Sequence, residues 1–201
     1  MLSLKFRDNI SIEILFLCYL EAGIIPVRKI DRMKIAYNRG ENELIRKIKE
    51  EEYKLLEDFL YEAIFIPEGM EPPEKSIINS PELKVYIEEF GKFKNDLCYV
   101  AELEGKVVGA VWVRIMKDYG HVDDETPSLA ISLYPEYRGM GIGTELMNGI
   151  LMELKKKGYK QVSLSVQKNN YAVKMYQKVG FIIFNETEEE YIMINCLQDM
   201  L

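Results

Sequence analysis

Residues 137–144 (YRGMGIGT) combine residue types that suit the binding of an anionic group. Gly139, Gly141 and Gly143 have no Cβ, so phosphate oxygens can approach the main chain closely and the turn can adopt positive φ angles. Arg138 lies beside them and can pair with a phosphate through its planar guanidinium. We therefore predict a phosphate-binding turn, for which a tight glycine-rich turn without a ligand is the plainer alternative.

Two common phosphate-binding motifs do not fit this segment. A P-loop ends in Gly-Lys followed by Ser or Thr, whereas here Gly143 leads directly to Thr144. A dinucleotide-binding fingerprint has the spacing G-x-G-x-x-G, and the last glycine here comes one residue too early. The phosphate must therefore belong to another class of ligand.

The elements on either side of the turn explain how it could bind an anion. Residues 128–133 (SLAISL) are typical of a strand, and residues 142–154 repeat apolar side chains at helical spacing before Gly158. Between a strand and a helix, unpaired N–H groups and the positive end of the helix dipole converge. Residues 161–166 alternate apolar and polar side chains, so we expect a second strand parallel to the first, with a right-handed crossover.

The remaining elements are predicted from periodicity and turn residues. We expect strands within residues 44–48, 97–102, 106–115, 181–184 and 191–195, and helices over 51–61, 81–90 and 169–179. The dipeptide Glu104-Gly105 suits a hairpin turn, and prolines make residues 66–80 irregular. The acidic run 186–190 is interpreted as a solvated hairpin turn without a functional role.

Two motifs together resemble the GCN5-related N-acetyltransferase (GNAT) family. The family pattern R/Q-x-x-G-x-G/A is matched by Arg138, Gly141 and Gly143. Its second pattern, N-x-x-A-x-x-x-Y followed by Gly-Phe, is matched by Asn169, Ala172, Tyr176 and Gly180-Phe181. The resemblance implies a GNAT domain over residues 34–201, with residues 1–33 as an N-terminal appendage.

The resemblance also implies a fold and a cofactor. The expected α/β (α+β) fold has a mixed, mostly antiparallel sheet of about six or seven strands, a splayed parallel central pair and about four flanking helices. The expected acyl donor is acetyl-CoA, with its pantetheine arm in the gap between the splayed strands. The implied cofactor-binding residues are Ile131, Leu133, Arg138, Gly139, Met140, Gly141, Ile142, Gly143, Thr144, Asn169, Ala172 and Tyr176.

Catalytic roles follow from the same resemblance. The N–H group of Leu133 would polarise the thioester carbonyl. The phenol of Tyr176 is protonated at neutral pH, so it would serve as the general acid for the departing thiolate. Without the family match, Tyr176 would be interpreted as an ordinary core tyrosine.

The acceptor amine needs a general base, and the loop before residue 128 offers several candidates. Glu125 is our first choice, with Asp123 and Asp124 as alternatives, and we expect this loop and His121 to contact the acceptor. Glu68, in a proline-rich loop, would add negative charge to an acceptor pocket or lie on an ordinary surface loop. Clustered carboxylates would favour a cationic acceptor. No motif predicts a metal site.

Composition narrows the remaining possibilities. The net charge of −7 argues against a nucleic-acid partner. Three scattered cysteines without CxxC spacing suggest a reducing cytoplasm. The apolar run 10–20 is too short to span a bilayer. It predicts a helix that packs on its own domain or mediates docking, and a homodimer is therefore conceivable.

We consequently expect an acetyl-CoA-dependent N-acetyltransferase acting on a primary amine of a small cationic metabolite or a peptide. A non-catalytic coenzyme A sensor, using residues 1–33 to contact a partner, is the alternative from another class. A third possibility is a longer acyl chain, which depends on pocket depth.

Overall fold

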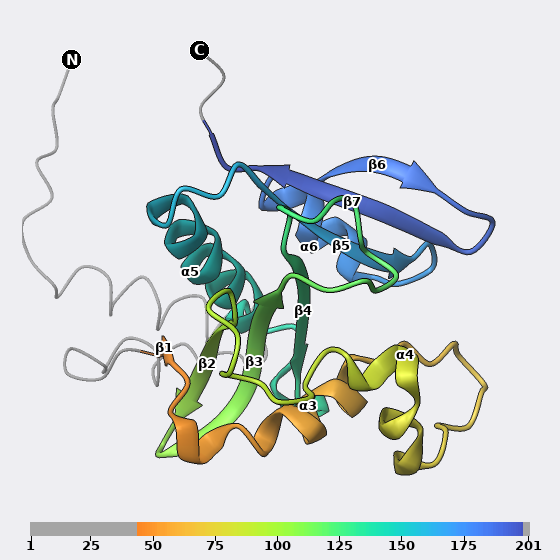
Figure 1. Ribbon diagram of the computed structural model, residues 1–201. Helices are drawn as coiled ribbons and strands as arrows, with labels where there is room; N and C mark the ends of the chain where they lie inside the picture. The colour runs from red at the N-terminus through yellow and green to blue at the C-terminus, as the bar shows by residue number, and fades with distance from the viewer. Residues whose placement is uncertain (1–43, 199–201) are drawn as a thin grey trace, which may run out of the picture. The chain divides into compact units, whose positions relative to one another are not determined.

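The computed structural model describes residues 44–198, which belong to one compact unit (Figure 1). The predicted appendage, residues 1–33, lies outside the described residues. Seven strands form one mixed sheet in the order β1-β2-β3-β4-β5-β7-β6. Only β4 and β5 run parallel, and the other neighbours are antiparallel. The expected mixed, mostly antiparallel sheet is confirmed.

The strands follow the predicted order with small shifts at their ends. Their bounds are β1 Ile45–Lys47, β2 Leu97–Leu103, β3 Lys106–Arg114, β4 Ser128–Leu133, β5 Gln161–Gln167, β6 Ile182–Glu186 and β7 Glu190–Cys196. Glu104 and Gly105 both have positive φ, at 52° and 77°, as a two-residue hairpin turn between β2 and β3 requires.

Four α-helices and three 3-10 turns complete the described part of the chain. The α-helices are α3 Leu55–Ala63, α4 Pro81–Lys84, α5 Ile142–Lys156 and α6 Ala172–Lys178, and the 3-10 turns are η1 Glu50–Glu52, η2 Lys75–Asn79 and η3 Pro135–Tyr137. The predicted helix over 51–61 is thus split into η1 and α3.

Each face of the central strands is covered by its own apolar core. Along β3, Val111 and Val113 pack with the buried side chains of α5, whereas Ala110 and Trp112 pack with those of α3. This alternation follows from the two-residue period of a strand. The sheet is therefore buried on both sides where β2, β3 and β4 lie.

The parallel pair separates soon after it forms. Ser128 and Ser163 are the one register pair between β4 and β5, where Ser163 N–H donates to Pro127 O at 3.0 Å. Beyond this point the two strands diverge (Figure 1), as the resemblance implied. Gly120 packs closely against the backbone of β5, because a Cβ placed on it would be 3.0 Å from Ser165 N.

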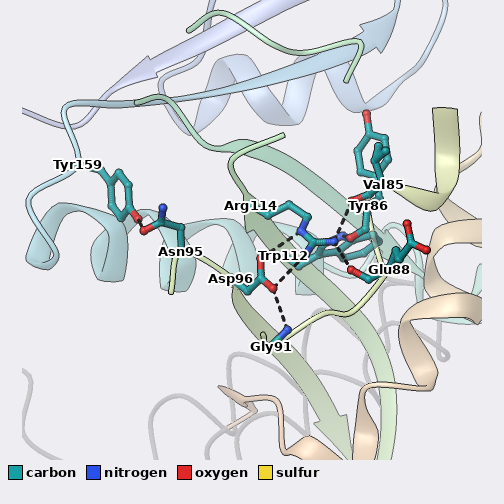
Figure 2. Close-up of polar contacts among 9 residues, drawn as sticks. All are labelled: Val85, Tyr86, Glu88, Gly91, Asn95, Asp96, Trp112, Arg114 and Tyr159. Atoms are coloured by element: carbon teal, nitrogen blue, oxygen red, sulfur yellow. Dashed lines mark hydrogen bonds and ion pairs between the residues drawn. The ribbon is translucent and has the colours of Figure 1, made fainter. Parts of the chain in front are cut away.

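The helix predicted over residues 81–90 ends at Lys84, so this prediction was wrong in its length. Arg114 Nη1 donates to the carbonyl oxygens of Val85 and Glu88, and Trp112 Nε1 donates to Tyr86 O (Figure 2). These hydrogen bonds occupy carbonyl oxygens that a longer helix would use for its own backbone hydrogen bonds. The periodicity of the sequence does not reveal that side chains of β3, far away in the chain, compete for these carbonyl groups.

Candidate active site

The glycine turn joins η3 to the N-terminus of α5. Gly139 and Gly141 have φ angles of 72° and 86°, and Gly141 is the residue that caps α5. Within the described residues, no atom lies within 4 Å of a Cβ placed on either glycine. The turn is consequently open on the side from which a ligand would approach.

Main-chain donors are available at this turn. Thr144 N–H and Glu145 N–H both donate to Gly141 O, whereas Ile142 and Gly143 form the first turn of α5 and precede its internal hydrogen-bond ladder. Gly139, Gly141, Gly143 and Thr144 line a cavity of about 1110 Å³. Unpaired N–H groups and the helix dipole therefore face a space large enough for an extended anionic ligand.

Arg138 makes contacts that the sequence did not predict. Its Nη2 lies 2.7 Å from Glu62 Oε2 and also donates to Glu62 O, and its Nε donates to Leu133 O at 2.9 Å. The guanidinium thus ties the turn to the end of α3 and to the end of β4. Its predicted pairing with a phosphate is untested, and the main chain is the anion-binding element that the structure offers.

The open edge of β4 can be located from its hydrogen bonds. Tyr134 N–H donates to Val108 O on β3. Because N–H groups alternate between the two edges of a strand, those of Ile131 and Leu133 point away from β3, toward the gap before β5. Both residues also line the large cavity.

Tyr176 lies on α6 at the junction of two cavities. Its side chain is buried, and it lines both the large cavity and a second cavity of about 390 Å³. Burial raises the pKa of its phenol above the ordinary value. No acceptor for its hydroxyl proton is found within residues 44–198. The phenol is therefore protonated and available as a donor.

The start of α6 involves two asparagines. Asn169 is exposed and lines the large cavity together with Ala172. Asn170, which the motif match passed over, lines both cavities, and its Oδ1 accepts a hydrogen bond from Ala172 N–H at 2.9 Å. This bond begins α6 at Ala172, three residues later than predicted. The adjacent asparagine in the sequence was the signal that could have indicated it.

The acidic loop lines neither of the two cavities, and its predicted contact with the acceptor stays a prediction. Asp123 Oδ1 accepts from Glu125 N–H and Thr126 N–H, and Gln161 Nε2 contacts Asp123 Oδ2. Gln161 begins β5, so the loop sits at the end of β4 opposite the glycine turn. Neither cavity is lined by His121, Asp123, Asp124 or Glu125.

The predicted role of Glu125 as general base also stays a prediction. Glu125 is exposed, and its backbone N–H closes a local turn with Asp123. Glu68, by contrast, lines the large cavity beside Pro67 and Pro72, although its side chain is exposed.

Sequence patterns did not point to the side chains that line the smaller cavity. Its polar lining residues include Tyr86, Tyr119, Ser165, Gln167 and Glu190. Glu190 belongs to the acidic run interpreted as a solvated turn, yet it begins β7 and pairs with Gln167. The alternating polar residues of β5 could have indicated this cavity. A central strand with polar side chains on one side must adjoin a polar space on that side.

Residues 44–198 contain no group of three or more His, Cys, Asp or Glu side chains placed to hold a metal ion. Over the same residues, none of the helices combines the length and the apolar character needed to cross a bilayer.

Comparison with curated proteins finds relatives over part of the chain. Probable N-acetyltransferase camello of Xenopus tropicalis is 34% identical over 89 residues, which are 44% of this chain and 39% of the relative. The [ribosomal protein bS18]-alanine N-acetyltransferase of Haemophilus influenzae is 36% identical over 58 residues, which are 29% of this chain and 40% of the relative. The chain thus spans about two fifths of the length of these relatives.

Solved structures share the fold over a larger part of the chain. The PaiA N-acetyltransferase of Thermoplasma acidophilum, solved in complex with coenzyme A, superposes with a TM-score of 0.57 at 23% identity, over 76% of this chain and 97% of that one. The sequence model of the acetyltransferase (GNAT) family matches residues 59–181, which include both motifs and the residues around the large cavity. The chain belongs to the acetyltransferase (GNAT) family.

Proposed function

We propose that this protein transfers an acetyl group from acetyl-CoA to a primary amine. The observation that carries the proposal is the convergence of three features on one cavity. These are the open glycine turn at the start of α5, the unpaired edge of β4 and the buried phenol of Tyr176. Family membership supports the same cofactor.

The residues of the large cavity fit a pyrophosphate followed by a pantetheine arm. The N–H groups of Gly141, Ile142 and Gly143 would bind the pyrophosphate at the positive end of α5. The open edge at Ile131 and Leu133 would pair with the amides of the arm. Asn169, Asn170 and Ala172 would line the wall that faces it.

Two groups would promote the chemistry. Leu133 N–H would donate to the thioester oxygen as it gains negative charge. Tyr176 would donate its phenolic proton to the sulfur as the carbon–sulfur bond breaks. Acetyl-CoA supplies the activated acetyl group, and no metal ion takes part in this scheme.

The acceptor is proposed to be the amine of a small cationic metabolite or of a peptide. One relative is named an N-alpha-acetyltransferase and another a [ribosomal protein bS18]-alanine N-acetyltransferase, which supports testing peptide N-termini first. A cytoplasmic location is part of the proposal and is supported by the free thiols of Cys98 and Cys196. A homodimer is likewise a proposal, which light scattering can test.

The test is a mass-spectrometric screen with acetyl-CoA and a panel of amino acids, polyamines, aminoglycosides and peptides with free N-termini. We expect at least one acetylated product, with release of an equal amount of coenzyme A thiol. Tight coenzyme A binding without any product would favour the sensor hypothesis. Absence of acetyl-CoA binding in calorimetry would overturn the proposal altogether.

A further inference from the structure

The smaller cavity is the space into which an acceptor would enter, and we call it the acceptor chamber. It is lined by residues from α3, the segment before β2, β4, β5 and the start of β7. It shares Ile131, Asn170 and Tyr176 with the large cavity. A group held against Tyr176 from the cofactor side is therefore accessible from this chamber.

Glu190 is the one acidic or basic side chain among the described residues that line the acceptor chamber. Its two carboxylate oxygens are held in place from β5. Ser165 Oγ donates to Oε2 at 2.8 Å, and Gln167 Nε2 donates to Oε1 at 3.1 Å. A single fixed negative charge in a mainly neutral chamber attracts a cation more strongly than the same charge in water.

Apart from Tyr176, whose hydroxyl stays a donor, three neutral groups of the chamber have a donor engaged by a neighbouring carboxylate, namely Tyr86, Ser165 and Gln167. Tyr86 donates its hydroxyl proton to Asp118 Oδ2 at 2.7 Å, and Asp118 also accepts from Ser128 Oγ at 2.6 Å. Burial raises the pKa of Tyr86, so its proton stays on the phenol. With that proton engaged, the Tyr86 oxygen can only accept a hydrogen bond from a ligand.

The β5 wall of the chamber also offers acceptors. The hydroxyl proton of Ser165 is engaged by Glu190, and the amide nitrogen of Gln167 also faces Glu190. The remaining capacity of Ser165 Oγ and of the Gln167 carbonyl oxygen is to accept. An ammonium group has three donors and no acceptor, so it complements this arrangement.

From these contacts we infer that Glu190 is the general base for the acceptor and that the chamber selects a cationic primary amine. The inference rests on the proposed function. In this inference Glu190 takes the place of Glu125, which lies in the loop before β4. The preference for a cationic acceptor is likewise attributed to Glu190 rather than to the acidic loop.

Glu190 takes one proton from the bound ammonium, and the nitrogen lone pair forms a bond to the thioester carbon. The carbon–sulfur bond breaks with its electron pair on sulfur, which takes the phenolic proton of Tyr176. The second nitrogen proton returns to the phenolate through water, and Glu190 releases its proton to solvent. One ammonium and one thioester thus give one amide, one thiol and one proton.

The test compares Glu190→Gln with Glu189→Gln, a matched variant of the preceding exposed carboxylate in the same hairpin. We expect Glu190→Gln to lower kcat/KM for a cationic amine by about 10²-fold, within the range of general base catalysis. Acetyl-CoA affinity should not change, because Glu190 does not line the large cavity. Glu189→Gln should leave both quantities unchanged.

A second readout separates a base from a residue that only supports the fold. With an amine whose conjugate acid has a pKa below the assay pH, no base is needed, so the loss in Glu190→Gln should largely disappear. Should Glu190→Gln fail to fold, Ser165→Ala, which removes one hydrogen bond to the carboxylate, should show the same amine dependence with a smaller loss.

The outcomes distinguish the two proposals. If the unmodified protein acetylates an amine and Glu190→Gln does so at an equal rate, the role of Glu190 is overturned while the proposed function stands. An equal loss with both kinds of amine would also overturn it. If the unmodified protein neither binds acetyl-CoA nor forms product, both proposals fall together.

Discussion

Tyr176 has two properties that a general acid requires. Its phenol lies where the two cavities meet, and no described residue accepts its proton. Its ring packs against Phe181 with a centroid distance of 5.9 Å. Both properties support the proposal that Tyr176 protonates the departing sulfur.

Replacing Tyr176 with Phe removes the donor and keeps the ring. We expect kcat to fall by roughly 10²-fold while acetyl-CoA affinity stays within about twofold, because the proton is needed only when the bond breaks. Steady-state kinetics and calorimetry measure the two quantities. An unchanged kcat would show that water or another group protonates the leaving thiolate.

The raised pKa of Tyr176 predicts a feature of the pH profile. A general acid works in its protonated form, which persists at every pH below its pKa. Because burial raises that pKa above the ordinary 10.0, kcat should not fall as the pH rises to 10.0. A kcat profile measured with a saturating amine tests this, and a decline centred well below 10.0 would contradict the assignment.

At the residue scale, local motif spacing predicted that Asn169, Ala172 and Tyr176 lie close together, and all three line the large cavity. Their roles toward the cofactor stay predictions. Glu190 was missed because its neighbours in the chain are turn carboxylates, whereas its partners Ser165 and Gln167 lie on another strand. Only strand pairing brings them together.

At the scale of elements, the start of α5 is the feature on which cofactor binding depends. Gly141→Ala would keep the helix but place a Cβ in a left-handed conformation on the ligand side of the turn. We expect acetyl-CoA affinity to fall at least tenfold, because the Cβ would stand where phosphate oxygens approach the main chain, whereas the backbone strain itself lowers stability rather than affinity.

Gly158→Ala provides the matched control for this prediction. Gly158 follows the other end of α5, has a φ of 82° and also has no atom within 4 Å of a placed Cβ. The control should lose similar stability in urea denaturation but keep its acetyl-CoA affinity by calorimetry. Equal losses of affinity in both variants would show that the turn does not bind the cofactor.

The elements themselves were predictable to different degrees. The strands and α5 have strong periodic patterns and appeared close to their predicted bounds. The segment after α4 has a helical pattern, but Arg114 and Trp112 hydrogen bond to its carbonyl groups (Figure 2). Such long-range contacts override local propensity, and a single sequence does not display them.

At the scale of the whole molecule, a buried ion pair joins Arg114 at the end of β3 to Asp96, directly before β2. The same guanidinium also holds the segment after α4. The side chains of Arg114 and Asp96 are 5% and 1% exposed, and Asp96 also accepts from Gly91 N–H at 2.8 Å. Asp96→Ala would leave the guanidinium buried without its charge partner. We expect unfolding free energy to drop by about 3–5 kcal/mol, measured by urea denaturation.

An exposed ion pair nearby, between Lys84 and Glu88, serves as the comparison for this buried pair. Lys84 and Glu88 are 49% and 53% exposed, so Lys84→Ala should leave the unfolding free energy nearly unchanged. A similar small effect for Asp96→Ala would mean that the Arg114 contact does not hold the segment in place.

Across the whole chain, the sequence identified the fold and the cofactor side better than the acceptor side. The cofactor turn is local, because one strand, one turn and one helix build it. The acceptor chamber is assembled from residues far apart in the chain, such as Leu60, Tyr86 and Glu190. Their proximity depends on sheet order, which places β7 beside β5.

The most direct test of the central claim is a crystal structure of the protein with acetyl-CoA. We predict pyrophosphate oxygens within hydrogen-bond distance of the N–H groups at Gly141–Gly143, the pantetheine arm along the open edge of β4, and the sulfur beside Tyr176. Electron density for the cofactor anywhere else, with the glycine turn free of phosphate, would contradict the account.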